Sequence, residues 1–485
     1  MSNTQPNILL IMSDQHNKHV CGCYGDTVIS TPHIDALASE GVVFENAYCP
    51  FPLCAPSRMS FMTGRGSSDI GMYENSAILH SHVPTFAHLL GGNGYDTALC
   101  GRMHFNGPDQ RHGFQRRLFP EVTGTSAGML SDTPGFMRAS LEKSGPGRNH
   151  YLLYDRECVE SAVSWLIERR RGRDRPFCLV VGLVGPHCPY VCPPELFWKY
   201  YEKVPLPNNT EGRLERLHPY NRRFIRRSKI DDATETEIRR TRAAYYGMVE
   251  FDDQLIGLLL DALRESSLLD ETVVIYTSDH GDMLGEHGML WKMSFYEASV
   301  GIPLVVRMAG SDGGGRRVSP AVSLIDLAPT LTDIAGTSSI PDVAGKSLVG
   351  YLQHGHPRAK RDGVYSELMI PPDVWTVHGP SGGPGRMLRK GRWKFAYYHG
   401  EDHELYDIES DPEEVNDLAA DPEYGDICDE MREQVLAGWD PGVLTRAMSR
   451  YARKRNLVGA TPPDPGVLAG EYWEGPEGYG YVEEI

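Results

Sequence analysis

Short apolar runs alternate with longer amphipathic stretches along most of this 485-residue chain. Runs rich in valine, isoleucine and leucine that are bounded by turn residues are typical of buried strands. Such runs lie at residues 7–14, 95–101, 176–184, 271–279 and 302–310. Helical patterns lie between them, so the sequence predicts an α/β fold with a mostly parallel sheet between helices.

Two helices can be bounded from the sequence. Thr31 stands before Pro32, which suits the first helical position, and Gly41 follows the amphipathic segment, so a helix is predicted between them. A longer helix is predicted over residues 233–265, where apolar residues recur mostly four positions apart. These residues are Ala244, Met248, Leu255, Leu259 and Leu263.

Proline and glycine are dense between residues 370 and 390, and they mark a boundary. Beyond it, "RWKFAYYHG" and "HELYDIESDPEEVNDLA" predict a hairpin followed by a helix. We therefore expect a catalytic domain over residues 1–370 and a smaller α+β subdomain with a tail over residues 371–485.

The composition excludes some partners and compartments. The net charge of −17 argues against nucleic acid and anionic membrane, since both require a basic surface. The N-terminal run "ILLIM" is too short for a signal core or a membrane span, so a cytoplasmic protein is expected. The ten cysteines are then reduced thiols. Cys21-x-Cys23 and Cys188-x3-Cys192 lack the second pair of a usual zinc site, which does not favour zinc.

Polar side chains follow four of the predicted strands. Ligands of parallel sheets bind beyond the carboxyl ends of the strands, so we expect these side chains to converge. They are Asp14 and Gln15, Arg102 and His104, His187, and Asp279 and His280.

Two of these strand ends carry groups that can hold a metal ion. The carboxylates of Asp14 and Asp279 and the amide oxygen of Gln15 suit Ca²⁺, Mg²⁺ or Mn²⁺, and the imidazole of His280 favours Mn²⁺ somewhat. Either pair alone could cap a helix or form a turn. Two pairs at two strand ends predict a metal site.

Cys54 stands at the predicted start of a helix, directly before Ala-Pro-Ser-Arg. A cysteine alone is usually a small buried hydrophobe. However, "CAPSRMSFMTG" resembles the type I sulfatase signature, Cys-x-Pro-Ser-Arg followed by Thr-Gly. The resemblance extends to "PNILLIMSDQ", "TPHIDALASEGVVFENAY", "GRMHFNGPDQRHGF", "GPHCPY", "TSDHGDMLGEHG" and "ELYDIESDPEEVNDL".

The resemblance implies an alkaline-phosphatase-like fold with a smaller C-terminal domain. It also implies that Cys54 is oxidised to formylglycine, so a formylglycine-generating enzyme is an expected partner. The hydrated aldehyde would attack the sulfur of a sulfate ester, and Arg58, one turn further along the helix, would orient it. One divalent cation would be held by Asp14, Gln15, Cys54, Asp279 and His280.

The resemblance assigns the remaining roles as well. His187 or Lys292 would protonate the leaving oxygen, and His104 would take a proton from the second hydroxyl of the hydrate. Asn75 and Arg102 would bind sulfate oxygens, although many relatives carry lysine in place of Arg102. The metal set also departs from the Asp-Asp and Asp-Asn set of many sulfatases. It resembles choline sulfatases and phosphonate or phosphodiester monoester hydrolases, which leaves Ca²⁺ as the expected ion and Mn²⁺ as the alternative.

The longest matches resemble choline sulfatases. The expected function is therefore hydrolysis of a small soluble sulfate monoester similar to choline sulfate, with release of inorganic sulfate. A phosphonate monoester or phosphodiester hydrolase, an aryl or carbohydrate sulfatase, and a non-catalytic anion-binding relative are the alternatives. A homo-oligomer is expected.

A quaternary ammonium is held by aromatic faces, so choline sulfate requires an aromatic cage. Two groups of aromatic residues are candidates for the cage. They are Phe119 and Phe136, and Tyr472, Trp473, Tyr479 and Tyr481 of the tail. The tail could reach a neighbouring subunit's site or could be solvated.

Overall fold

The fold is built on a large central sheet. The computed structural model describes residues 5–122, 136–169, 175–210, 213–311, 314–359, 361–369 and 383–459. The sheet has eight strands in the order β12-β2-β11-β9-β1-β7-β4-β5. In chain order they are β1 (Asn7–Ser13), β2 (Val42–Phe44), β4 (Asp96–Gly101), β5 (Arg116–Phe119), β7 (Phe177–Gly182), β9 (Thr272–Ser278), β11 (Leu304–Arg307) and β12 (Arg316–Val318).

The centre of the sheet is parallel. β1 pairs in parallel with β7 and β9, so that Leu10 lies beside Val180 on one side and Ile275 on the other. β4 continues the parallel order beyond β7, and β5 continues it beyond β4. β11 runs antiparallel to both β9 and β2. The predicted strand at 302–310 therefore belongs to the sheet in the opposite direction to its central strands.

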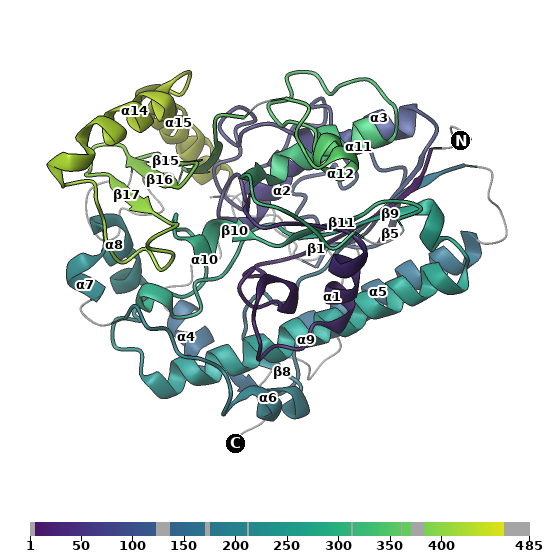
Figure 1. The fold of residues 1–485 in the computed structure, drawn as a ribbon, viewed down its shortest axis with the longest axis horizontal. Coiled ribbons are helices and arrows are strands. Elements are labelled where there is room, and N and C mark those ends of the chain that lie inside the picture. The colour runs from purple at the N-terminus through teal and green to yellow at the C-terminus, as the bar shows by residue number, and fades with distance from the viewer. Residues whose placement is uncertain are drawn as a thin grey trace.

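Helices cover both faces of the sheet (Figure 1). One face carries α1 (Pro32–Glu40), α5 (His150–Arg169), α6 (Pro194–Tyr200) and α9 (Glu235–Glu265), and the other carries α2 (Cys54–Thr63), α3 (Phe86–Gly92), α11 (Leu327–Ile334) and α12 (Val349–His354). Alternate residues of β1 enter the two cores, with Leu9 and Ile11 in one and Leu10 and Met12 in the other. The predicted α/β class with a mostly parallel sheet is confirmed.

The two helices bounded from the sequence are present. α1 lies between Thr31 and Gly41 as predicted. α9 begins after Thr234, whose side chain accepts a hydrogen bond from the Glu237 N–H while the Glu237 carboxylate accepts the Thr234 N–H. This reciprocal cap explains the start of α9, the longest of the described helices. No helix within the described ranges combines the length and apolar character needed to cross a membrane.

A separate antiparallel sheet forms the C-terminal unit, at the upper left of Figure 1. Its strands, in spatial order, are β14 (Val364–Leu368), β15 (Gly385–Lys390), β16 (Trp393–Tyr398) and β17 (Glu404–Asp407). α14 (Gly425–Leu436) packs on this sheet, and α15 (Pro441–Gly459) follows.

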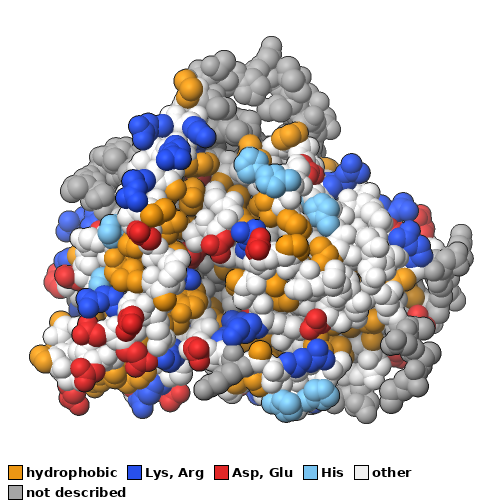
Figure 2. Space-filling model, turned by 90° about the horizontal axis from the view of Figure 1, so that it is seen from above, with side chains coloured by type: hydrophobic (Ala, Val, Ile, Leu, Met, Phe, Trp, Pro, Cys, Tyr) orange, Lys and Arg blue, Asp and Glu red, His pale blue; other side chains and the backbone are white. Residues whose placement is uncertain are grey.

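The face of the molecule seen from above carries acidic and basic side chains interspersed with hydrophobic ones (Figure 2).

The predicted hairpin is confirmed as β16 and β17, which pair antiparallel. The helix predicted directly after it is wrong, because turns follow β17 and α14 begins only at Gly425. The carboxylate of Asp411 accepts the backbone N–H groups of Val415 and Asn416, and that of Asp417 accepts those of Leu405 and Ala419. Side chains that bind backbone groups in this way compete with helix formation.

The remaining elements are short connections. The strands are β3 (Ala47–Tyr48), β6 (Gly145–Pro146), β8 (Val191–Cys192), β10 (Gly301–Ile302) and β13 (Val322–Ser323). The helices are α4 (Phe136–Glu142), α7 (Arg213–Arg216), α8 (Pro219–Ser228) and α10 (Glu297–Val300). The 3-10 turns are η1 (Gly22–Tyr24), η2 (Leu269–Glu271), η3 (Glu286–Gly288), η4 (Leu324–Asp326) and η6 (Pro422–Tyr424).

Buried charges join the C-terminal unit to the sheet domain. Lys394 of β16 forms ion pairs with Glu297 of α10, at 3.2 Å, and with Glu414. Lys18 approaches the other oxygen of Glu297 at 3.2 Å. We call Lys18, Glu297, Lys394 and Glu414 the interface cluster. Its four side chains are buried, so their charges must satisfy one another.

Candidate active site

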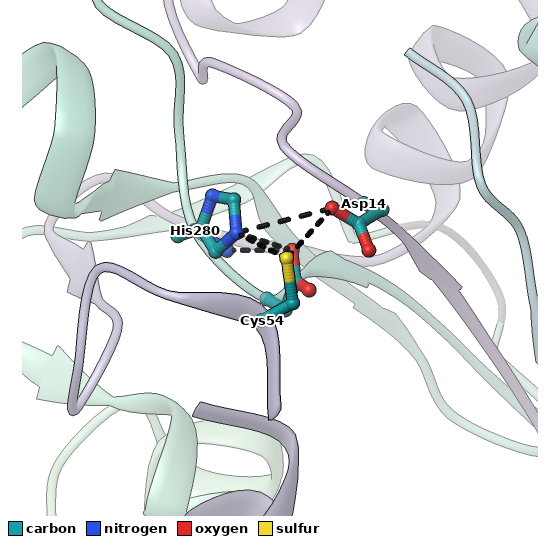
Figure 3. A group of neighbouring side chains, drawn as sticks. Asp14, Cys54 and His280 are labelled. Carbon is teal, nitrogen blue, oxygen red and sulfur yellow. Dashed lines mark hydrogen bonds and ion pairs between the residues drawn. The ribbon is translucent and has the colours of Figure 1, made fainter. Parts of the chain in front are cut away.

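Four potential metal ligands converge at the carboxyl edge of the central sheet. They come from the ends of β1 and β9 and from the start of α2, and they are Asp14, Cys54, Asp279 and His280. One ligand atom of each lies within 4.8 Å of the others, and all four residues are buried. Cys54 Sγ lies 3.5 Å from Asp14 Oδ1 and 3.3 Å from His280 Nε2. Figure 3 shows the sulfur pointing between these two side chains.

The two carboxylates are held from behind by Arg58. Its Nε donates to Asp279 Oδ2 at 2.7 Å, and its Nη2 donates to Asp14 Oδ2 at 3.2 Å. The Oδ1 atoms of both carboxylates remain on the side of His280 Nε2, at 3.8 and 3.7 Å. Burial alone would raise the pKa of Asp14, but the charges of Arg102 and Arg58 outweigh it and hold that pKa well below its ordinary value. Asp14 is therefore an anion that can bind a cation.

His280 presents the ring nitrogen that a metal requires. Its Nδ1 lies 3.0 Å from the carbonyl oxygen of Gly281, so the Nδ1–H donates there and the Nε2 lone pair faces Asp14 and Cys54. Burial lowers the pKa of His280, although the nearby Asp279 carboxylate opposes the shift. A neutral imidazole with its second nitrogen fixed by a carbonyl is the usual form of a metal-ligating histidine.

Cys54 is the first residue of α2, where the structure confirms the predicted helix start. The backbone N–H of Ala55, in the first turn, donates to Asn75 Oδ1 at 3.0 Å. The predicted sulfate ligand Asn75 therefore lies at the N-terminus of this helix, next to Cys54. Unpaired N–H groups at a helix start attract anions.

Arg102 and His104 follow β4 and lie beside Asp14. Arg102 Nε donates to Asp14 Oδ2 at 2.6 Å, and its Nη2 donates to His104 Nδ1 at 3.1 Å. Burial lowers the pKa of His104 well below its ordinary value, and the charge of Arg102 adds to the shift. His104 Nε2 is buried and has no hydrogen-bond partner among the residues that the structure describes, as expected of a group whose partner is the substrate.

Gln15 and Lys292 touch each other on the same side of the site. The Lys292 ammonium donates to Gln15 Oε1, and Gln15 Nε2 donates to Asp282 Oδ2 at 2.5 Å. Burial alone would lower the pKa of Lys292, but Cys54 and Asp14 outweigh it, and the pKa is raised. Lys292 therefore keeps its proton. In this structure the amide oxygen of Gln15 accepts a hydrogen bond from Lys292.

His187 follows β7 and is partly exposed. Its Nδ1 lies 2.6 Å from the carbonyl oxygen of Cys188, so the Nδ1–H donates there. His187 is among the groups that act on the pKa of Asp14, which places it within electrostatic reach of the site. The ring of Tyr151, at the start of α5, stands edge-on to His187 with the ring centroids 6.2 Å apart.

Three supporting residues were not predicted. Glu121 accepts the backbone N–H groups of Met103 and His104, at 3.0 and 2.7 Å. Asp282 accepts Gln15, as above, and Asp155 accepts the N–H groups of Val184 and Gly185 before His187. Asp282 lies within the quoted "TSDHGD" stretch and could have been found there. Glu121 and Asp155 are single carboxylates without a motif.

Of the aromatic residues predicted for a cage, the structure describes the side chain of Phe119. Phe119 packs against Tyr154 of α5, with the ring centroids 5.2 Å apart. The side chain of Phe136 and the tail that carries Tyr472, Trp473, Tyr479 and Tyr481 lie outside the described residues. Tyr151 is the aromatic side chain that the structure places beside His187.

A cavity of about 590 Å³ lies between the sheet domain and the C-terminal unit, where Ser68, Arg361, Glu367 and Trp439 are among its lining residues. None of the predicted site residues, all of which the structure describes, lines it. The position of the active site therefore rests on the chemistry of converging side chains and not on cavity size.

Comparisons with known proteins agree with this geometry. The sulfatase family profile matches residues 6–337, and a profile of the C-terminal part of N-sulphoglucosamine sulphohydrolase matches residues 285–438. The choline-sulfatase of Rhizobium meliloti (strain 1021) is 34% identical, over 94% of this chain and 91% of its own length. Arylsulfatase K of Xenopus laevis is 29% identical, over 86% of this chain and 80% of its own.

The same fold is found in a crystal structure of the phosphonate monoester hydrolase of Agrobacterium radiobacter. It superposes with a TM-score of 0.77 at 24% identity, covering 89% of this chain and 95% of that one. At this identity the similarity shows the fold alone. The family profile and the 34% identical relative, which span most of the chain, carry the assignment. This chain belongs to the sulfatase family and is a sulfuric ester hydrolase.

Proposed function

We propose that this sulfatase hydrolyses a small soluble sulfate monoester, with choline sulfate as the favoured substrate. The reaction would use formylglycine formed at Cys54 and one divalent cation. The observation that carries the proposal is the convergence of four buried potential ligands on one point, with Arg58 behind them. Arg102, His104 and Lys292 lie around that point.

The donor set fits a hard divalent cation. Asp14 Oδ1, Asp279 Oδ1 and His280 Nε2 face one point, and the residue at position 54 would complete the set. Carboxylate oxygens suit Ca²⁺, the favoured ion, and the imidazole keeps Mn²⁺ as the alternative. When bound, the cation would polarise a sulfate oxygen and the nucleophile. Gln15 would join the set by turning its amide oxygen away from Lys292.

Cys54 is the proposed precursor of the nucleophile, and a formylglycine-generating enzyme would mature it. In the sulfatase family the hydrated aldehyde supplies one hydroxyl that attacks sulfur and a second whose deprotonation releases sulfate. Arg58 would hold the two carboxylates, while Asn75, at the start of α2, would bind a sulfate oxygen. Arg102 would bind another through its planar donor fork.

Proton transfer would fall to Lys292, His187 and His104. Lys292 would donate a proton from Nζ to the leaving oxygen, with His187 Nε2 as the other candidate. Arg102 donates to His104 Nδ1, so the neutral ring carries its proton at Nε2. The base role of His104 needs the other tautomer, which becomes available once the Arg102 guanidinium turns to a sulfate oxygen.

The choice of choline sulfate is supported by the 34% identical choline-sulfatase and by the ring of Tyr151 next to His187. Burial raises the pKa of the Tyr151 phenol, and the charges of Arg102, Asp14 and Cys54 also act on it. The ring is therefore within electrostatic reach of the reacting atoms. An aromatic face there would attract a quaternary ammonium on the alcohol side of the ester.

The test is kcat/KM for choline sulfate, an aromatic sulfate and a phosphodiester, on protein whose Cys54 peptide has the mass of the aldehyde. We expect choline sulfate to exceed the other two by about two decades, which is the scale of one or two strong cation–π contacts. A flat profile would exclude a selective ammonium pocket. A profile led by the phosphodiester would favour the phosphonate monoester or phosphodiester hydrolase alternative at the same site.

A further inference from the structure

Two cysteines in the connection from β1 to α1 lie beside a carboxylate of α1. Cys21 Sγ and Cys23 Sγ are 3.5 Å apart, and one ligand atom from each of Cys21, Cys23 and Asp35 lies within 4.8 Å of the others. Cys21 is buried, whereas Cys23 and Asp35 are partly exposed, so the group is open to solvent on one side. We propose that these three residues bind a thiophilic divalent cation, and that zinc fits their chemistry best.

The distance between the sulfurs suits two ligands of one ion. Thiolate–zinc bonds of about 2.3 Å at a tetrahedral angle place two sulfur ligands about 3.8 Å apart. The observed 3.5 Å is close to this value. A disulfide needs about 2.0 Å between its sulfurs, so a covalent bond would require both side chains to move. Both sulfurs are therefore close enough to bind one ion.

Gly22 leaves the space that the Asp35 carboxylate occupies. A Cβ at position 22 would lie 2.3 Å from Asp35 Oδ2. Any larger residue there would push the carboxylate away from the two sulfurs. The glycine between Cys21 and Cys23 therefore allows the third ligand to approach.

The Asp35 carboxylate is also oriented by hydrogen bonds. The Thr31 hydroxyl donates to Asp35 Oδ1 at 3.2 Å and accepts the Gly22 N–H at 2.9 Å. The backbone N–H of Cys23 donates to the same carboxylate. Hydrogen bonds to ligands of this kind fix their direction and raise metal affinity. The three ligands thus belong to a connected arrangement and not to a chance cluster.

The donor types select the ion. Two thiolates and one carboxylate favour zinc over calcium or magnesium, which bind oxygen ligands. A water on the open side would be the fourth ligand, and binding would release the two thiol protons. The site differs in this respect from the candidate active site, where two carboxylates and an imidazole suit a harder ion. Two sites in one chain would then select two different ions.

The position of the three residues predicts a structural role. The connection between β1 and α1 starts with Asp14 and Gln15 and ends at Thr31. An ion shared by Cys21, Cys23 and Asp35 would fasten this connection to α1. Because zinc would bind the folded chain and not its scattered ligands, it should raise the Tm.

The experiment is a zinc titration of the full chain after reduction and removal of bound metal with a chelator. A chromophoric zinc indicator serves as the competitor, and excess Ca²⁺ is added to occupy the candidate active site. The wild-type protein should bind one equivalent more than Cys21→Ser and Cys23→Ser, each of which should lose about 100-fold or more in affinity. Cd²⁺ in place of zinc should give the ultraviolet thiolate-to-metal absorption in the wild type, and this absorption should be lost in Cys21→Ser and Cys23→Ser. Cys428→Ser, in α14, is the matched thiol control and should behave as the wild type does.

Two variants keep both thiols and guard against misfolding of the cysteine variants. Asp35→Asn and Gly22→Ala should each weaken zinc by about tenfold or more, with the Tm in chelator close to that of the wild type. Cys54→Ala should retain the additional equivalent. Equal zinc binding by the wild type and both cysteine variants would overturn the proposal. So would a Cys21–Cys23 disulfide in the purified protein that, once reduced, leaves thiols without zinc affinity.

Discussion

Two of the buried charge groups that the structure describes differ in geometry, and one of them has the geometry of an active site. The interface cluster joins the C-terminal unit to the sheet domain through Lys18, Glu297, Lys394 and Glu414. The candidate active site lies at the carboxyl edge of the sheet. Both are nearly free of solvent exposure, so burial and charge alone do not distinguish them.

The orientation of the ligand atoms makes the difference. In the interface cluster, Lys394 lies between Glu297 and Glu414, and Lys18 takes the other oxygen of Glu297. Opposite charges face each other there. In the candidate active site the cation Arg58 stands behind the carboxylates, and ligand atoms face one another across a point. Such an arrangement directs ligand atoms toward a point that a cation could occupy, as expected of a functional site.

The largest expected effect is on turnover. Cys54→Ala should lower kcat/KM for any sulfate ester by about 10³-fold or more, because it removes the precursor of the nucleophile. The Tm should change little, since the side chain is small. Cys428→Ala, in α14, is the control and should keep full activity. Steady-state sulfate release measures the activity of both variants. A Cys54→Ala protein that still hydrolyses sulfate esters would contradict the assignment of the active site.

The interface cluster should behave in the opposite way. Lys394→Met leaves Glu297 and Glu414 without their shared cation, so the free energy of unfolding should fall by about 3–5 kcal/mol. kcat/KM should stay unchanged at temperatures where the variant is folded. Lys390→Met breaks the exposed pair with Glu430 and should lower the free energy of unfolding far less. Urea unfolding gives both values, and a loss of activity in the folded Lys394→Met protein would contradict the assignment.

Substitutions of Lys292 and His187 distinguish which of the two residues protonates the leaving oxygen. Lys292→Met should lower kcat about 10²-fold for an alkyl sulfate and much less for a nitrophenyl sulfate, whose leaving oxygen needs no proton. His187→Gln should show a smaller difference between the two esters. Leaving-group dependence found in His187→Gln and not in Lys292→Met would reverse the assignment.

The pH dependence of stability provides a fourth test, next to the interface cluster. The Glu404 carboxylate accepts Tyr398 and Tyr406 hydroxyls, and burial raises its pKa to about 7. A raised folded-state pKa means that the folded state binds the proton more tightly. The stabilisation that protonated Glu404 gives to the folded state is therefore fully present below about pH 4.5 and is lost as the pH rises to about 7.

Between pH 5 and pH 7 the wild type should lose about 2 kcal/mol of unfolding free energy relative to Glu404→Gln. Above pH 7 the difference should level off. Denaturant titrations at four pH values measure it. A difference that is constant with pH would show that Glu404 is ionised in the folded protein.

The smallest expected effect concerns the substrate. Tyr151→Leu should raise KM for choline sulfate by about 3- to 30-fold, the range of one cation–π contact, and should leave KM for an uncharged alkyl sulfate within about twofold. Tyr151→Phe keeps the ring and should keep the KM. An equal rise for both esters would show that Tyr151 shapes the pocket without recognising an ammonium.

The candidate active site was predicted from the sequence because its residues lie in recognisable motifs. The ends of β1 and β9 and the helix start at Cys54 were enough to predict that Asp14, Asp279 and His280 lie together, because parallel strands end at one edge of the sheet. The interface cluster was not predicted, since its ion pairs join residues of distant elements and no local pattern marks them. The same holds for Asp35, which the fold brings to Cys21 and Cys23.

Local predictions failed where side chains bind the backbone. The acidic stretch after β17 has a helix-like composition, yet Asp411 and Asp417 bind nearby N–H groups and hold turns instead. Gln15 was predicted to be a metal ligand, but its amide oxygen accepts a hydrogen bond from Lys292. Both depend on which polar partner lies within reach in the folded chain, and spacing along the sequence does not give that information.

Position 54 is proposed to supply the nucleophile as formylglycine. The most direct measurement takes preparations with different extents of maturation and compares sulfate release with the aldehyde fraction of the Cys54 peptide, determined by mass. Turnover should be proportional to that fraction and should vanish where the peptide carries an unmodified thiol. Full turnover by protein whose Cys54 is entirely a thiol would contradict a formylglycine nucleophile at this position.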